Sequence, residues 1–229
     1  MISGIYNLMD GSLTQDLRFE TIANNMANSN TNGFKRDIIS FNQTLEMQSN
    51  SKTDFAQGPV RYTGNELDIA LGAQGFLKIQ TPTGIRYSRD GALSINAEGF
   101  LVTGSGDQVL GENGPISVEG GTVSIGQDGQ VSVDNEPADK LLIVGFDKPE
   151  LLKKEGASCY SYQGDNKEIS KQTDAVVKQR YLEGSNVNPT QEMIEMIETF
   201  RAFESVEKAI QSIDGSTGKM INDYGQVPQ

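Results

Sequence analysis

The spacing of apolar positions divides the chain into three parts. In residues 2–26, apolar side chains recur every three or four positions, as on one face of an amphipathic helix; they are Ile2, Ile5, Leu8, Met9, Leu13, Leu17, Phe19, Ile22 and Met26. Gly4 and Gly11 weaken this helix, because each glycine costs about 1 kcal/mol relative to alanine. We expect it to end at the turn formers of residues 28–33 and to be marginal alone.

The middle of the chain has the short alternating pattern of half-buried strands, interrupted by most of the 25 glycines. Residues 81–84 predict a hairpin turn between strands at 76–79 and 85–88. We expect the positive φ of tight turns at Asp90-Gly91 and Asp128-Gly129. Residues 141–146 predict a more buried strand, since their apolar residues are consecutive. Other strands are expected at 67–71, 92–96, 100–103, 123–125 and 131–133.

Helical spacing returns near the C-terminus, where one face carries Met193, Met196, Ile197, Phe200, Phe203, Val206, Ile210 and Ile213. Asn188 fits the N-cap, Pro189 the first helical position and Gln191 the reciprocal position of a capping box. Acidic residues of the first turns, Glu192 among them, suit the positive end of the helix dipole.

These patterns predict an α+β fold in which the N- and C-terminal amphipathic helices pair as a coiled-coil-like stalk around an all-β middle domain of short strands and tight turns. The expected parts are an N-terminal helix and turn (1–35), a linker (36–56), the β-rich domain (57–150), an extended connection back (151–187), and the C-terminal helix and tail (188–229). A helix pair leaves apolar surface exposed, which neighbouring subunits would cover. A monomeric helical hairpin packed on the β domain is the alternative.

Composition narrows the possible functions. A net charge of -12 and a pI near 4.5 disfavour nucleic acid and anionic membranes as partners. The apolar runs are too short for a membrane-spanning helix, and residues 1–4 do not resemble a classical signal peptide. The chain has no histidine and a single cysteine, Cys159, which we expect to fill apolar space. We therefore predict that the protein is not an enzyme and has no catalytic, cofactor or metal site.

Three segments resemble the flagellar rod, hook and hook-associated protein family. Residues 23–35, ANNMANSNTNGFK, are similar to its N-terminal signature, residues 63–103 to the core of its β domain, and residues 182–214 to its C-terminal helix. The short connection before residues 53–65 and the extension 218–229 resemble the proximal-rod branch more than the distal-rod branch. The motif residues are Ala23, Asn24, Asn25, Ala27, Asn28, Asn30, Thr31, Gly33, Phe34 and Lys35. Capping and turn chemistry is the alternative explanation for the asparagines.

The resemblance implies a structural subunit of the basal-body rod, exported by the flagellar type III apparatus without a cleaved signal peptide and located in the periplasm. It implies that the subunit polymerises with copies of itself and other rod proteins into a drive shaft around the export channel. The partners expected are therefore those proteins and the export apparatus, with neither nucleic acid nor direct membrane insertion.

Helix packing is expected to use Ile5, Met9, Leu13, Leu17, Ile22, Met26, Met193, Ile197, Phe200, Phe203, Val206 and Ile210. Among these, we expect Ile5, Met9, Leu13 and Leu17 to face Met193, Ile197, Phe200 and Phe203, and contacts within the chain and between subunits both remain open. A different class of function is an exported β-rich module that binds glycan or peptidoglycan through exposed aromatic side chains. The strand rhythm places Tyr62, Phe76, Tyr87 and Phe100 toward the core instead.

Overall fold

The computed structural model describes residues 2–40, 50–72, 75–156, 158–172 and 176–225. The chain forms two compact units. The helical unit contains Met1–Ala27, Ile38–Ser51 and Asn188–Gln229, and the β unit contains Asn28–Asp37 and Lys52–Val187. The expected α+β class, with a helix near each end and a mostly β middle, is confirmed.

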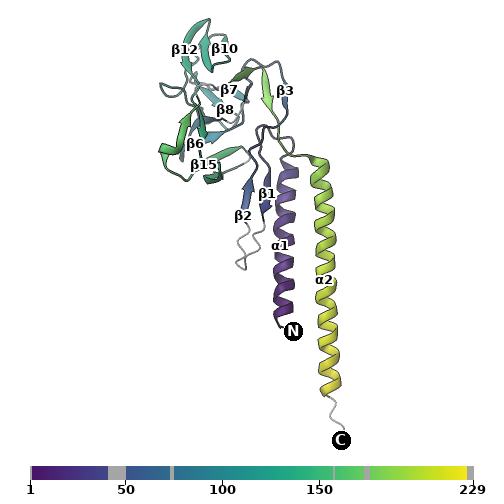
Figure 1. Cartoon of the computed structure of the whole chain (residues 1–229). Helices are drawn as coiled ribbons and strands as arrows, with labels where there is room; N and C mark the ends of the chain where they lie inside the picture. The colour runs from purple at the N-terminus through teal and green to yellow at the C-terminus, as the bar shows by residue number, and fades with distance from the viewer. Residues whose placement is uncertain (1, 41–49, 73–74, 157, 173–175, 226–229) are drawn as a thin grey trace. The chain divides into compact units, whose positions relative to one another are not determined.

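The helical unit is built from α1 (Ile2–Ala27) and α2 (Pro189–Gly225), which contact each other and run antiparallel (Figure 1). The expected start of α2 is confirmed, because Asn188 Oδ1 accepts hydrogen bonds from the N–H groups of Thr190 (3.1 Å) and Gln191 (3.4 Å). The Gln191 side chain donates to Glu195 at 3.1 Å, so its amide binds forward along the helix instead of completing a capping box.

The β unit holds a large antiparallel sheet with the order β14-β15-β6-β5-β9-β8-β7, in which β13 pairs with both β5 and β16. A three-stranded sheet, β10-β11-β12, and two-stranded pairs β17-β4 and β18-β3 accompany it. The strands of the chain are β1 (Asp37–Ser40), β2 (Asn50–Thr53), β3 (Val60–Tyr62), β4 (Ile69–Leu71), β5 (Phe76–Thr81), β6 (Gly84–Ser88), β7 (Leu93–Ile95), β8 (Leu101–Thr103), β9 (Gln108–Val109), β10 (Val123–Ile125), β11 (Gln130–Val133), β12 (Glu136–Lys140), β13 (Ile143–Phe146), β14 (Leu152–Lys154), β15 (Cys159–Tyr162), β16 (Ile169–Lys171), β17 (Val177–Gln179) and β18 (Tyr181–Glu183). Two short 3-10 helices span Pro149–Leu151 and Asn166–Glu168.

The predicted hairpins at residues 81–84 and at Asp128-Gly129 are confirmed, whereas the turn at Asp90-Gly91 does not form one, because β6 pairs with β5 and β15 and not with β7. β5 pairs with β6 around residues 81–84, β7 with β8, and β10 with β11 across Asp128-Gly129, where Gly129 has φ +82°. The expected positive φ at Gly91 is wrong. Gly91 lies against the Ile69 backbone, and a Cβ there would collide with the Ile69 carbonyl, so close approach of two chain segments requires this glycine.

The segments 151–187 and 36–56 differ from their prediction as a connection and a linker. Residues 152–183 contribute β14 to β18. In the main sheet, β15 pairs with β6, and β14 pairs with β15. In the second segment, β1 and β2 pair with each other. The predicted N-terminal part also divides at Asn28, where the β unit begins.

Two apolar clusters form the core of the β unit. The larger one contains aliphatic side chains of the short strands, with Ile69, Leu77, Leu101 and Val131 among them. The second gathers Phe76, Tyr87, Val144, Leu152 and Tyr160. Cys159 is partly buried against the first cluster, which agrees with its expected role as a space filler.

Candidate assembly surfaces and the anchoring of the N-terminal motif

One row of α2 side chains is consistently buried or half-buried. Its members are spaced alternately by four and three residues: Glu192, Met196, Thr199, Phe203, Val206, Ile210 and Ile213. The spacing averages 3.5 residues, which is the repeat that keeps one row of side chains facing a partner helix in a coiled coil. We call this row the seam. At the start of the row, Asn25 Nδ2 of α1 donates to Glu192 Oε2 at 3.3 Å, and both residues are buried. The row therefore begins at a buried polar contact between α1 and α2.

A second row of α2, next to the first, is apolar but open to solvent. Met193, Ile197 and Phe200 are 51%, 55% and 55% exposed, and Ile194 beside them is also exposed. On α1, Met9 and Leu13 are 56% and 54% exposed. We call Met193, Ile197 and Phe200 the open row.

The expected pairing of Met9 and Leu13 with the open row stays a prediction, and all five side chains remain more than half exposed in the chain. The buried side chains of α2, Glu192 and Thr199, belong to the neighbouring row instead. Among the other predicted packing residues, Ile22 is buried, whereas Leu17, Met26, Phe203, Val206 and Ile210 are half-buried. Ile5 lies outside the residues whose side chains are described.

Sequence reasoning missed two buried polar members of the seam. Glu192 was assigned to the helix dipole, but its carboxylate meets Asn25 across the pair. Thr199 was not singled out, and it is buried one position from Phe200. Both residues fall on the same four-three spacing as the apolar side chains of the row, and this spacing could have predicted their burial.

The N-terminal motif spans both units. Its asparagines serve different purposes: Asn28 forms a turn with Thr31, whose N–H and hydroxyl donate to Asn28 O (3.1 Å) and Oδ1 (3.2 Å). Turn chemistry therefore accounts for Asn28, whereas Asn25 binds Glu192 in the helical unit. Ala23 and Asn24 belong to α1 with Asn25 and Ala27, and Asn30 lies in the turn that follows.

Gly33 and Phe34 dock the end of the motif onto the β unit. Gly33 has φ +66°, a Cβ there would lie 2.5 Å from the Arg89 carbonyl carbon, and its N–H donates to Glu183 O at 2.8 Å. Phe34 is buried with the Lys154 ammonium 4.0 Å from its ring centroid, a cation–π contact. Glycine is thus required here by both conformation and space.

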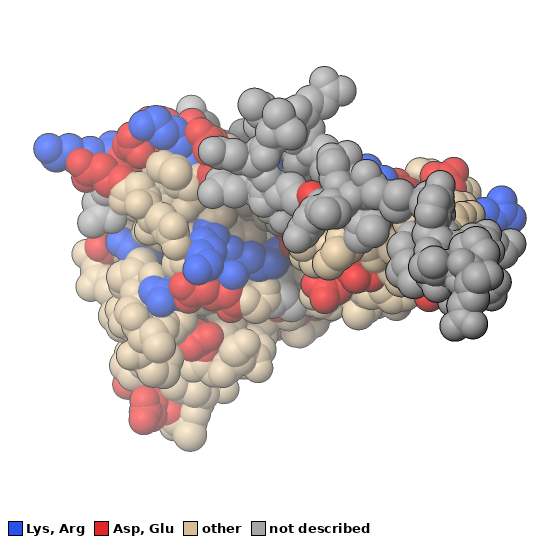
Figure 2. All heavy atoms as spheres, turned by 90° about the horizontal axis from the view of Figure 1, so that it is seen from below, with Lys and Arg blue, Asp and Glu red and all other residues tan. Residues whose placement is uncertain are grey.

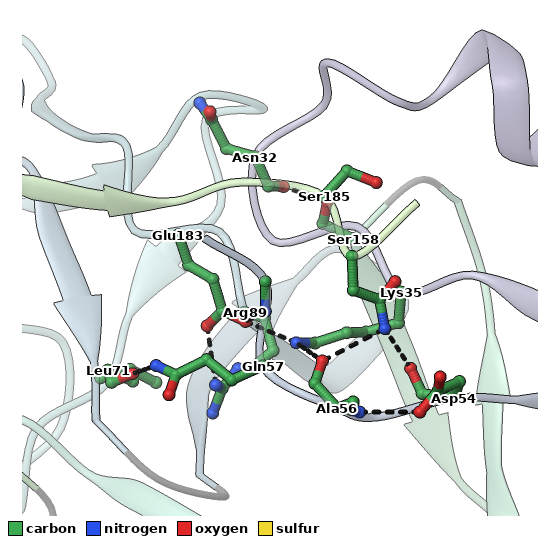
Figure 3. Close-up of polar contacts among 12 residues, drawn as sticks. Asn32, Lys35, Asp54, Ala56, Gln57, Leu71, Arg89, Ser158, Glu183 and Ser185 are labelled. Atoms are coloured by element: carbon green, nitrogen blue, oxygen red, sulfur yellow. Dashed lines mark hydrogen bonds and ion pairs between the residues drawn. The ribbon is translucent and has the colours of Figure 1, made fainter. Parts of the chain in front are cut away.

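Lys35, Arg89 and Glu183 form what we call the charge cluster, which is almost completely buried (Figure 3). Lys35 Nζ lies 2.5 Å from Glu183 Oε1, and Arg89 Nη2 lies 2.7 Å from Glu183 Oε2. The Gly58 N–H also donates to Glu183 Oε1 at 3.0 Å, while Lys35 donates to Ala56 O at 2.8 Å. Burial lowers the pKa of Lys35 from its ordinary value, and the hydrogen bond to Glu183 opposes that shift.

Asn186 ties the chain before α2 to the segment that follows α1. Its N–H donates to Phe34 O (3.3 Å), and its Oδ1 accepts from the Arg36 N–H (2.7 Å). Its Nδ2 donates to Asp54 O (2.8 Å) and Ala56 O (3.1 Å). Within the β unit, one side chain thereby joins three segments of the chain.

The aromatic side chains agree only partly with their predicted burial. Phe76 and Tyr87 are buried, and Phe100 is half-buried. Tyr62 is 64% exposed and stacks edge-on against Tyr181, with ring centroids 5.2 Å apart. The prediction was wrong for Tyr62 because β3 has no buried face.

A polar hollow of about 330 Å³ in the β unit is lined by hydroxyl and acidic side chains together with Cys159. Burial raises the pKa of Cys159, which disfavours the nucleophilic thiolate. Among the described residues, no group of three acidic, cysteine or histidine side chains could hold a metal, and neither helix is apolar enough over a sufficient length to cross a membrane. On the face drawn in Figure 2, basic side chains lie beside acidic ones.

Three family descriptions match successive parts of the chain. "Flagella basal body rod protein" matches residues 5–35, "Flagellar hook protein FlgE/F/G D1 domain" matches 70–133, and "Flagellar basal body rod FlgEFG protein C-terminal" matches 178–223. The first covers the whole N-terminal motif, and the third covers the seam and the open row.

Full-length relatives give the same result. The flagellar basal-body rod protein FlgF of Caulobacter vibrioides is 32% identical over 99% of this chain and 100% of its own length. FlgF of Escherichia coli is 32% identical over 96% and 97%, and FlgG of Bacillus subtilis is 30% identical over 97% and 99%. With matches of this extent at both termini and in the β unit, the chain belongs to the flagellar basal-body rod protein family.

Proposed function

We propose that this protein is a structural subunit of the proximal flagellar rod, which polymerises through its terminal helices and performs no catalysis. The similarity to FlgF proteins over nearly the whole chain supports the proximal assignment, and FlgG-like distal rod function is the near alternative. The observation that carries the proposal is the open row of α2, an apolar face adjacent to a seam that is already occupied.

The helix pair acts as a coiled-coil-like stalk. The four-three spacing of the seam on α2 is that of a left-handed coiled coil, and Asn25–Glu192 is a buried polar contact that can fix its register. Buried polar groups favour one alignment because any other leaves them without partners. Ile22 and Thr199, both buried, supply packing near the same end.

The open row then receives a helix from a neighbouring subunit. Three apolar side chains at spacings of four and three form a second seam of the same geometry, and Met9 and Leu13 of α1 offer apolar surface of similar size. An α1 patch docking on an α2 row is a heterologous contact, which builds open helical polymers. Such a rod encloses the export channel, spans the periplasm and transmits torque, and its subunits reach it through the type III apparatus.

Deletion of residues 188–214 tests the proposal. Cells carrying the deleted chain should assemble no filaments, although the β unit should remain soluble because both core clusters lie within it. Replacing the same residues with an unrelated helix of equal length is the matched control, and it should also fail. Normal swimming in either strain would contradict the proposal.

The exposed Tyr62–Tyr181 pair favours, as a second candidate, a glycan- or peptidoglycan-binding role of the β unit. Stacked aromatic side chains on a surface can bind sugar rings. Sedimentation of the purified protein with intact peptidoglycan sacculi, lost on Tyr62→Ala and Tyr181→Ala, would support this role. Absence of binding by the unaltered protein would remove it.

A further inference from the structure

We propose that the charge cluster of Lys35, Arg89 and Glu183 sets the register of the β3–β18 pair, and that it contributes this specificity instead of net stability. It would thereby fix how much chain lies between the β unit and the start of α2. The cluster is a positioning device, and only its expected effect on swimming rests on the proposed rod function.

The cluster should add little to the free energy of unfolding, because the desolvation of its three charged side chains offsets their mutual attraction. Lys35, Glu183 and Arg89 are 0%, 2% and 4% exposed, so two cations and one anion have left water. Desolvation of each ion is costly, and the mutual attraction of buried ions often only offsets it. Replacement of such a group by apolar side chains of similar volume is commonly neutral or stabilising.

The β3–β18 pair lacks the usual determinant of register, because neither strand alternates between buried and exposed side chains. All three residues of β3 are exposed, whereas in β18 Tyr181 is exposed and both Leu182 and Glu183 are buried. Register is weakly specified where one strand of a pair, here β3, buries neither face. The observed register opposes Tyr62 to Tyr181 and Val60 to Glu183.

Glu183 supplies the missing determinant, because its carboxylate receives donors from three other segments. Lys35 reaches it from the segment after α1, the Gly58 N–H from the approach to β3, and Arg89 from the segment after β6. Arg89 is itself held by the Gly75 carbonyl. A slip of β18 by one residue would bring Leu182 or Gly184 to this point and leave Lys35 and Arg89 buried without an anion.

Glycines beside the cluster restrict the alignment further. A Cβ at Gly58 would collide with the Gly184 carbonyl, and the Gly184 N–H donates to Pro59 O at 2.8 Å. The close approach of these backbones occurs only when Gly58 and Gly184 are level with each other. Since residues 184–188 lead directly to Pro189, a one-residue slip would change the chain length available before α2.

The test compares register and stability in a Cys159→Ser background. Cysteine pairs report alignment: Tyr62→Cys with Tyr181→Cys traps the observed register, and Tyr62→Cys with Arg180→Cys traps the one-residue slip that brings Leu182 opposite Val60. Each pair is placed in the unaltered cluster and in the triple variant Lys35→Met, Arg89→Leu, Glu183→Leu. The single variant Lys35→Arg, which keeps the charge, is the conservative control.

In purified protein, we expect the unaltered cluster and Lys35→Arg to form the first disulfide at least tenfold faster than the second. The triple variant should unfold at the same or a higher temperature but lose most of this preference. Its Cys-free form should fail to restore swimming to cells lacking the native chain. If that swimming defect were absent while the register preference fell, the rod function, not the register role, would be in doubt.

Two results would overturn the inference. One is a triple variant that keeps the tenfold preference for the observed register. The other is a triple variant that fails to fold or unfolds at a markedly lower temperature, because the cluster would then be supplying stability.

Discussion

The open row of α2 gives the sharpest test of assembly. We consider the double substitution Ile197→Gln and Phe200→Gln, at two side chains that are each 55% exposed. Full burial of an isoleucine or phenylalanine contributes about 1.5–3 kcal/mol, and rather more than half of each side chain remains to be buried on docking. Each substitution should therefore weaken a subunit contact by roughly 1 kcal/mol, and the pair by about 2 kcal/mol, which is about 30-fold in affinity.

The same change should leave the isolated chain almost unaffected. Substitutions at exposed positions usually alter stability by within about 0.5 kcal/mol, and glutamine forms helices at least as well as the residues it replaces. The measurements are swimming in soft agar, electron microscopy of isolated basal bodies and thermal unfolding of the purified protein. Glu207→Gln, on an exposed position of the same helix, is the matched control.

We expect rods to be rare or incomplete in the double variant, with unchanged unfolding and with normal rods in the control. Full motility and normal rods in the double variant would refute the reasoning, since the open row would then have no partner. A lowered unfolding temperature would equally contradict it, because the row would be part of the intrachain core.

Three further predictions follow from single contacts. Gly33→Ala should destabilise the β unit by roughly 2 kcal/mol or more in denaturant unfolding, because a Cβ meets the Arg89 backbone at a positive φ; Gly104→Ala, in the same unit and with free space at its Cβ, should have little effect. Asn188→Ala should lower helix content and cost about 1 kcal/mol through loss of the N-cap, whereas Asn188→Asp should retain it. Desolvation and the hydrogen bond to Glu168 raise the pKa of Tyr162 to about 12, so its contribution to stability is present below pH ~10 and lost as the pH rises through 12; Glu168→Gln should shift this ionisation to lower pH in ultraviolet titration.

The sequence predicted those parts of the fold that depend on residues close together in the chain, such as helix caps and hairpin turns. Asn188 and Pro189 mark the beginning of α2 because a cap and a fixed φ act over three or four residues. The turn at residues 81–84 and Gly129 with its positive φ determine hairpins whose strands are adjacent in sequence. In each case the partner groups lie within a few residues of one another.

The features that the sequence did not predict depend on distant partners. Glu183 and Lys35 are 148 positions apart, and Asn25 and Glu192 are 167 apart, so the residues around one partner do not identify the other. β14 and β16, LKK and ISK, carry too few apolar residues to be recognised as strands; pairing with β15 and β13 determines them. The choice between two adjacent apolar rows of α2 likewise depends on where α1 lies.

At several positions of this chain, polar side chains are buried and apolar side chains are exposed, which is the reverse of the usual pattern. Polar side chains, Asn25 and Glu192 in the helix pair and the charge cluster in the β unit, occupy buried positions, whereas Ile197 and Phe200 lie outside. For a monomer this arrangement costs free energy twice, once through desolvation and once through exposed apolar area. In the polymer that we propose, the buried polar contacts restrict each subunit to one conformation, and burial of the exposed row supplies the free energy of docking. A variant that made the outside polar and the inside apolar should therefore be the more stable monomer and the poorer rod subunit.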